Sequence, residues 1–105
     1  MTAVTASVAS SASSVHLFPA AGGAGGAGYP FPLPNGTAGR TIVNESTAAL
    51  YVKFGTGASE TDYTVVLAGA AAPPYAYYEF PQPMYTGPVD GIWASANGNA
   101  RVTSW

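Results

Sequence analysis

The sequence contains no cysteine and very few charged side chains. Without cysteine, neither a disulfide nor a thiolate metal site can stabilise the fold. Charged residues make up 8% of the 105 residues, whereas an average soluble domain has about a quarter. A surface with so little charge is unusual for a domain that is fully exposed to water. We therefore expect part of this surface to be covered by other protein.

Basic residues are especially scarce, and so are long apolar segments. The chain has three Lys and Arg residues against five Asp and Glu residues, whereas nucleic-acid binding normally needs a cluster of basic side chains. No segment reaches the roughly 20 apolar residues of a membrane span. The N-terminus also lacks the basic and apolar regions of a targeting signal. The sequence predicts no nucleic-acid partner, no membrane partner and no export.

The composition changes near residue 38. Residues 1–38 are rich in Ala, Gly, Ser and Pro and contain no Asp, Glu, Lys or Arg, which predicts a long extended N-terminal arm before a β-domain at residues 39–105. A flexible linker is the simplest alternative. Against it, the apolar side chains of this segment are spaced as isolated anchors. We expect six of them to bind a partner: Val15, Leu17, Phe18, Tyr29, Phe31 and Leu33.

Short apolar runs separated by turn residues follow from Arg40 onward. Six runs predict strands: RTIVN, ALYVKF, YTVVLA, YAYYEF, DGIWAS and ARVTSW. They predict an all-β fold, a small antiparallel sandwich or barrel of about six strands. Alternation in ALYVKF places Leu50, Val52 and Phe54 in the core. In YAYYEF neither face is polar, so we expect Tyr75 and Tyr77 to contact a partner.

The segment ANGNA carries a strong hairpin signal. It predicts that the runs on either side of it pair with each other, but two registers are possible. With Asn97-Gly98 at the tip Trp93 faces Val102, and with Gly98-Asn99 at the tip Ile92 faces Trp105. A shift of one residue exchanges the two faces of a strand, so the sequence does not place Trp93 in the core.

Residues that could perform chemistry are few and scattered. His16 is the only histidine, and its place in the predicted arm offers no rigid scaffold for a Ser-His-Asp arrangement. Glu60 and Asp62 are typical of a solvated turn, and Glu79 with Asp90 would form a glycosidase pair only at a suitable separation. We predict no catalytic residue, no metal ligand, no cofactor and no enzymatic activity.

The aromatic side chains of the β-domain allow two interpretations. Exposed rings could stack on sugars, as in a carbohydrate-binding module, or the same rings could fill the core and subunit interfaces. Interfaces are the favoured interpretation, because Tyr and Trp are enriched there. The rings in question are Tyr75, Tyr77, Tyr78, Tyr85, Trp93 and Trp105.

Several blocks of the last 65 or so residues resemble a family of small structural proteins of tailed bacteriophages. The blocks are NES at 44–46, LYVKFG at 50–55, YYEFP at 77–81 and DGIW at 90–93. The resemblance carries no catalytic motif and does not extend to the predicted arm. It implies a non-enzymatic virion component that is assembled in the host cytoplasm.

The resemblance and the composition lead to one hypothesis about function. We expect a capsid decoration or cement protein that forms a homo-oligomer, with a trimer plausible, and contacts the major capsid protein or neighbouring virion proteins. In this hypothesis residues 1–38 staple neighbouring subunits, and many weak contacts add up to stable attachment. A head-to-tail neck or tail component and a carbohydrate-binding β-module are the alternatives.

Overall fold

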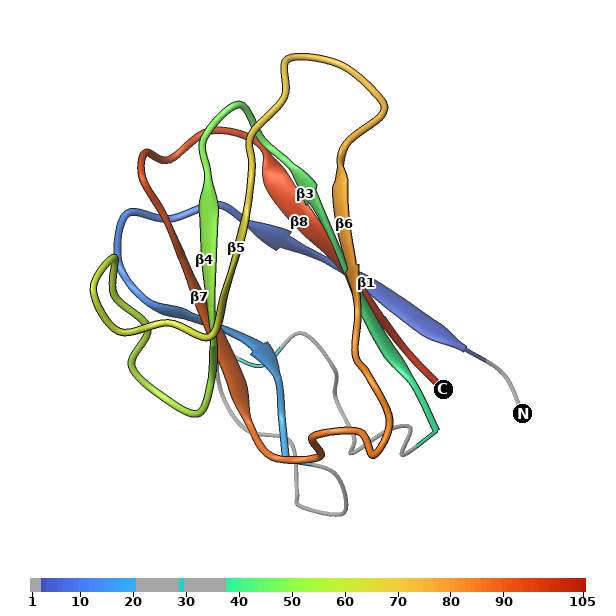
Figure 1. Ribbon diagram of the computed structural model, residues 1–105. Helices are drawn as coiled ribbons and strands as arrows, with labels where there is room; N and C mark the ends of the chain where they lie inside the picture. Colours follow the sequence, from blue (N-terminus) through green and yellow to red (C-terminus); the bar gives the residue numbers. More distant parts are fainter. Residues whose placement is uncertain (1–2, 21–28, 30–37) are drawn as a thin grey trace.

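The computed structural model describes residues 3–20, 29 and 38–105 and shows an all-β sandwich. Two antiparallel sheets of four strands pack face to face (Figure 1). The eight strands, in chain order, are β1 (Val4–Ala9), β2 (Val15–Phe18), β3 (Arg40–Glu45), β4 (Leu50–Phe54), β5 (Val65–Leu67), β6 (Ala76–Glu79), β7 (Val89–Trp93) and β8 (Asn99–Ser104).

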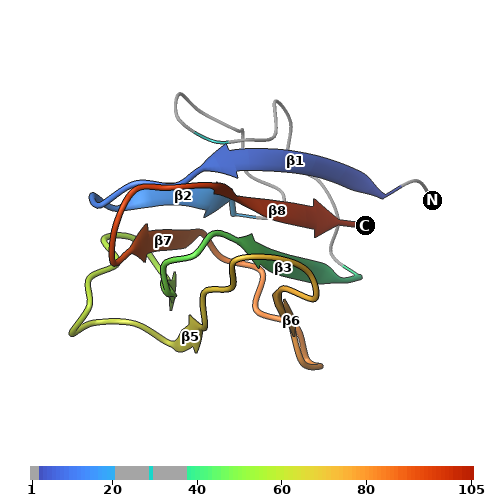
Figure 2. The same ribbon diagram turned by 90° about the horizontal axis from the view of Figure 1, so that it is seen from above.

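The order of the strands in the two sheets defines a jelly roll. One sheet has the order β1-β8-β3-β6 and the other has the order β2-β7-β4-β5. Apart from β4 and β5, strands that are consecutive along the chain therefore lie in opposite sheets, as seen from above in Figure 2. This double Greek-key arrangement of eight strands is the jelly-roll architecture.

The six strands predicted from the sequence are confirmed, and the predicted arm is wrong over its described part. Residues 4–18 form β1 and β2, each of which occupies one edge of a sheet. The predicted boundary at residue 38 thus does not separate an arm from the sandwich. The reason is that Val4, Ala6 and Val8 alternate with small polar residues, which gives β1 a weak apolar face toward the core, while the edge of β1 pairs with β8.

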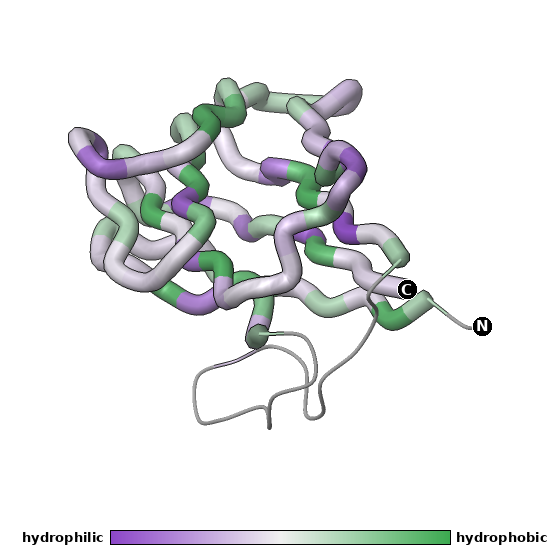
Figure 3. The backbone as a smooth tube through the Cα atoms, turned by 60° about the horizontal axis from the view of Figure 1, so that its bottom comes forward, coloured by the Kyte–Doolittle hydropathy of each residue, from purple (hydrophilic) through white to green (hydrophobic). Residues whose placement is uncertain are grey.

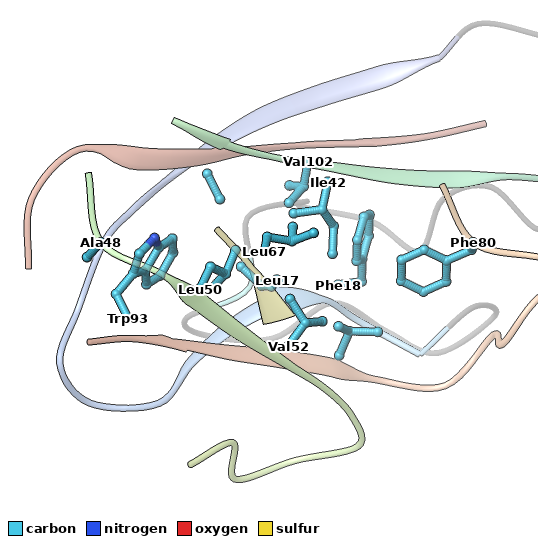
Figure 4. Close-up of a cluster of buried hydrophobic side chains, with 12 residues drawn as sticks. Leu17, Phe18, Ile42, Ala48, Leu50, Val52, Leu67, Phe80, Trp93 and Val102 are labelled. Carbon is cyan, nitrogen blue, oxygen red and sulfur yellow. The ribbon is translucent and has the colours of Figure 1, made fainter. Parts of the chain in front are cut away.

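The core fills the space between the two sheets with side chains from both (Figure 4). Leu50 and Val52 are fully buried and the half-buried Phe54 packs against the core cluster, as the alternation in ALYVKF predicts. Polar and apolar residues alternate along the strands in Figure 3 because each strand has one face toward the core. The twelve buried core residues are Leu17, Phe18, Ile42, Ala48, Leu50, Val52, Leu67, Phe80, Val89, Trp93, Ala100 and Val102.

A glycine on β7 leaves room for core side chains from the two neighbouring strands of the same sheet, β2 and β4. A Cβ added at Gly91 would lie 2.8 Å from Leu17 Cδ1 and 3.0 Å from Leu50 Cδ1. The two leucines therefore fill the space that a side chain at Gly91 would need.

The hairpin predicted at ANGNA is wrong. β7 pairs with β2 and β4, whereas β8 pairs with β1 and β3, so residues 94–98 cross from one sheet to the other. Gly98 has φ +74°, and a Cβ there would lie 2.3 Å from the carbonyl oxygen of Glu45. The positive φ and the lack of space for a Cβ both require glycine at this position. A turn that crosses between sheets can impose these two requirements as well as a hairpin can.

Candidate functional site

The anchors predicted in the first 38 residues do not form a single partner-binding surface. Leu17 and Phe18 are buried in the core of this chain, at 0% and 1% exposure, so their predicted role as partner anchors is wrong. Val15 is half-buried and packs against the same core. Tyr29 stacks on the His16 ring, with the ring centroids 4.2 Å apart. Phe31 and Leu33 lie outside the described residues.

The aromatic residues around β6 divide between the core and the surface. Tyr77 is 56% exposed, whereas Tyr75 is half-buried, and their predicted partner contacts remain a prediction. The Tyr77 hydroxyl donates a hydrogen bond of 2.7 Å to Glu79 Oε1, which raises the pKa of Tyr77. Tyr78 packs against the core, and Trp93 is fully buried. Trp93 therefore cannot serve as a sugar-stacking platform.

The outer face of the β2-β7-β4-β5 sheet carries an exposed apolar surface. Ile92, Tyr51 and Val66 lie directly opposite one another on β7, β4 and β5. Tyr63 contacts Tyr51 edge-on, with the ring centroids 5.1 Å apart. Tyr63 and Val66 are 44% and 43% exposed. We call Tyr51, Tyr63, Val66 and Ile92 the apolar strip.

A hydrogen-bonded cluster around Asp90 lies beside the apolar strip on the same sheet. His16 Nδ1 is 2.7 Å from Asp90 Oδ1, and the Gly57 amide donates to Asp90 Oδ2 over 2.8 Å. The Ser14 hydroxyl lies 3.4 Å from Asp90 Oδ2 and accepts a hydrogen bond of 3.0 Å from the Ala58 amide. The Asp90 carboxylate thus joins β2, the segment before it and the 55–58 loop.

The cluster contains Ser, His and Asp but does not have the geometry of a catalytic triad. In a triad the serine hydroxyl bonds to the imidazole nitrogen that faces away from the carboxylate. Here Ser14 bonds to the carboxylate itself, and its oxygen is already engaged by the Ala58 amide. Tyr29 covers one face of the His16 ring. The arrangement braces three segments and places no nucleophile on His16 among the described residues.

The other acidic residues considered from the sequence do not converge. Glu79 belongs to β6 and Asp90 to β7, which lie in different sheets, and each points away from the core of the sandwich. Asp62 forms an ion pair of 2.5 Å with Lys53, while Glu60 is exposed. In the part of the chain that the structure describes, no group of three or more His, Asp or Glu residues could hold a metal ion.

Arg40 is a buried cation that the sequence analysis missed. Its guanidinium donates to main-chain carbonyl groups at Pro19 (2.8 Å), Tyr85 (3.2 Å) and Gly87 (2.8 Å). The rings of Phe18 and Phe80 lie 4.9 and 5.9 Å from Arg40 Cζ. Burial lowers the pKa of Arg40. The side chain therefore fastens the end of β2 to the 85–87 segment before β7.

Replacing Arg40 with lysine should lower the free energy of unfolding by about 2 kcal/mol. A single ammonium cannot reproduce the planar fork that reaches Pro19 and Gly87 together, so buried carbonyl groups lose their donors. Urea denaturation measures the effect. Arg101→Lys is the matched control, because Arg101 is exposed and its replacement should stay within about 0.5 kcal/mol. Equal stability of the two variants would contradict the role assigned to Arg40.

The outer face of the β1-β8-β3-β6 sheet is polar and carries three charged side chains, Glu45, Glu79 and Arg101. Thr5, Thr103 and Thr41 form one row across three strands, and the Thr5 and Thr103 hydroxyl oxygens are 2.9 Å apart. Its one ion pair among the described residues joins Arg101 to Glu45 at 3.3 Å. Hydrogen bonds from Asn99 and Arg101 lower the pKa of Glu45.

The lowered pKa of Glu45 predicts a loss of stability in acid. A carboxyl group whose pKa is lower in the folded chain stabilises the fold above the unfolded-state value of about 4.5. This contribution disappears as the pH falls through the folded-state value. As the pH is lowered, the urea midpoint should therefore fall more steeply for the native chain than for Glu45→Gln. Parallel pH profiles would show that the carboxylate makes no such contribution.

Comparison with known protein families, curated proteins and solved structures found no match to this chain. Within the described ranges, no helix is long and apolar enough to cross a membrane. The fold and the surfaces of the sandwich are therefore the basis for any proposal about function.

Proposed function

We propose that this chain is a structural protein of a tailed-bacteriophage virion that decorates or cements the capsid. The observation that carries the proposal is an eight-stranded jelly roll with very little surface charge. Viral capsid proteins use this architecture widely, although lectins and cupins use it too. Because one fold can host several functions, the surfaces of the sandwich must support the proposal independently.

Two surfaces favour contacts with other proteins. The apolar strip exposes Tyr63 and Val66 side by side with Tyr51 and Ile92, and exposed apolar patches commonly mark interaction sites. The second surface is the β1 edge, which has no charged residue. A decoration protein needs such surfaces because it must bind a shell that offers the same contacts many times.

The blocks that resemble phage structural proteins coincide with residues that build the fold. Asn44 of the NES block and Trp93 of the DGIW block form a buried hydrogen bond of 3.0 Å between the sheets. Gly91 allows close packing, and Asp90 braces three segments. The resemblance thus supports a shared scaffold, while the identity of the binding partner depends on the surfaces.

The mode of attachment differs from stapling by a free arm. Residues 4–18 belong to the sandwich and Leu17 and Phe18 belong to its core, so they cannot thread along neighbouring subunits without unfolding it. We propose that the sandwich docks as a rigid body through its outer surfaces. A neck or tail location would use the same surfaces and would differ in copy number.

Quantitative mass spectrometry of gradient-purified particles tests this function. Particles of the phage that encodes the chain should contain it in a fixed ratio to the major capsid protein. A copy number in the hundreds supports capsid decoration, and about a dozen supports a neck ring, since copy number follows particle symmetry. Absence of the chain from purified particles would overturn the virion assignment. Lysates of the same infected cells, in which the chain must be present, provide the control.

Carbohydrate binding is a second candidate, favoured by the exposed ring of Tyr77 beside the Glu79 carboxylate. An aromatic ring can stack on a sugar while a carboxylate accepts hydrogen bonds from its hydroxyl groups. Calorimetric titration with a glycan panel tests this candidate, and Tyr77→Ala should abolish any binding that depends on the ring. No heat of binding across the panel would rule the candidate out for those glycans.

A further inference from the structure

Among the described residues no strand pairs with the outer edge of β1, and this edge lacks the features that usually protect an edge strand. Natural proteins block such edges with lysine, proline, bulges or very short strands. β1 is six residues long, carries no charge or proline, and keeps an unbroken register with β8. Val4 is one of the exposed large apolar residues, at 37% exposure. Figure 2 shows β1 at one margin of its sheet.

The register with β8 determines which main-chain groups of β1 point to the free edge. The Ser10 amide donates to the Gly98 carbonyl group, so this opposed pair is a hydrogen-bonded one. Hydrogen-bonded and non-hydrogen-bonded pairs alternate along an antiparallel ladder. Val8, Ala6 and Val4 therefore direct their amide and carbonyl groups to β8. Thr5 and Ser7 direct theirs away from β8, toward the open edge.

The sequence of this edge reads nearly the same in both directions. Residues 3–9 are AVTASVA, which is a palindrome about Ala6 apart from the exchange of Thr5 with Ser7. When such a strand pairs antiparallel with its own copy about Ala6, Val4 faces Val8 and Thr5 faces Ser7. Apolar residues then meet apolar residues, hydroxyl residues meet hydroxyl residues, and no like charges approach one another.

We propose that β1 is a homodimerisation edge whose occupant is β1 of a second copy of this chain. The two strands pair antiparallel about a two-fold axis through Ala6, as in other isologous interfaces. Thr5 and Ser7 exchange main-chain hydrogen bonds with Ser7 and Thr5 of the second copy, because these are the residues whose groups point outward. The two four-stranded sheets become one continuous sheet of eight strands by strand addition.

Sedimentation velocity of the full chain over a dilution series tests this interface. The native chain should show a monomer–dimer equilibrium. A lysine variant, Thr5→Lys with Ser7→Lys, should be monomeric at concentrations where the native chain is dimeric, because the register places lysine opposite lysine in both pairs. A native chain that stays monomeric throughout the series would overturn the proposal. So would a lysine variant that dimerises as the native chain does.

A mixing experiment tests the register itself. A glutamate variant, Thr5→Glu with Ser7→Glu, should also be monomeric alone, and mixing it with the lysine variant should restore dimers. Failure of the folded variants to form a mixed dimer would overturn the register. The charge-matched control Thr56→Lys with Ala72→Lys changes exposed loop positions and should dimerise like the native chain. Circular dichroism establishes that each variant is folded. None of these outcomes depends on the proposed virion function.

Discussion

Replacing Phe18 with alanine should destabilise the isolated chain by about 3–5 kcal/mol. Phe18 is 1% exposed, packs edge-on against Phe80 with the centroids 5.6 Å apart, and lies under the Arg40 guanidinium. Truncation leaves a cavity at this end of the core. A small domain has a total stability of about 5–15 kcal/mol, so the variant should lose a large share of it. Urea denaturation monitored by circular dichroism gives the value.

The effect of Phe18→Ala distinguishes two placements of residues 4–18: strands of the sandwich, or an arm that binds a partner. If residues 4–18 were an arm that orders only on a partner, Phe18→Ala would leave the stability of the isolated chain unchanged. Tyr77→Ala is the matched control, because it also truncates an aromatic ring but at a position that is 56% exposed. We expect the control to stay within about 1 kcal/mol of the native chain. Equal effects of the two substitutions would contradict the placement of β2 in the core.

Replacing Asn44 with alanine should cost about 3 kcal/mol or more, because the fully buried amide serves several partners. Its Nδ2 carries two hydrogens, which are shared among the carbonyl groups of Ala48 (2.9 Å), Leu67 (3.1 Å) and Ala68 (3.1 Å). Its Oδ1 accepts from Trp93 Nε1 over 3.0 Å. Truncation leaves these groups buried without their partner, and the loss should appear as a lower urea midpoint.

A double-mutant cycle with Trp93→Phe isolates the bond between the sheets. Trp93→Phe alone removes the indole donor and leaves Asn44 Oδ1 unpaired. In the Asn44→Ala background the same substitution should cost less, since the indole has already lost its acceptor. Asn99→Ala is the control for Asn44→Ala, because Asn99 is only half-buried and its side chain donates one hydrogen bond within the described residues, to Glu45. Additive effects within about 0.5 kcal/mol would contradict a coupled pair.

Local patterns predicted the strands that have a strong apolar alternation and missed those that do not. Leu50, Val52 and Phe54 repeat every second residue with large side chains, so β4 was clear from the sequence. In β1 only Ala6 and Val8 pack against the core, and the alternation of Val4, Ala6 and Val8 with Thr and Ser resembles low-complexity sequence. The pairing energy of β1 comes from β8, almost a hundred residues away, and no local window contains it.

The sheet to which each strand belongs was also beyond local reasoning. Asn97-Gly98 provides turn chemistry for a hairpin and for a crossing between sheets alike. The sequence left the face of Trp93 open, and the structure places it in the core, where Asn44 from the other sheet accepts its indole hydrogen. The same limit applies to Arg40, whose carbonyl partners come from Pro19 and residues 85–87. Such partners become visible only when distant segments meet.

The candidate surfaces could be predicted in part. Alternation in β4 placed Tyr51 away from the core, but the apolar strip also needs Ile92 and Val66 in register on the neighbouring strands. Tyr77 was expected on a surface and is exposed. The palindrome of residues 3–9 is visible in the sequence alone. Its relevance to pairing depends on the position of β1 at an edge, with alternate main-chain groups pointing outward, and no local pattern contains that position.

A cryo-EM reconstruction of the intact particle tests the central claim most directly, with the density of this chain located on the shell. We predict an eight-stranded sandwich at many symmetry-related positions, docked through its outer faces, with residues 4–18 inside the sandwich. Density at a single vertex would assign the protein to the neck or tail and not to the capsid surface. Absence from the particle, or residues 4–18 extended along neighbouring subunits, would contradict the account.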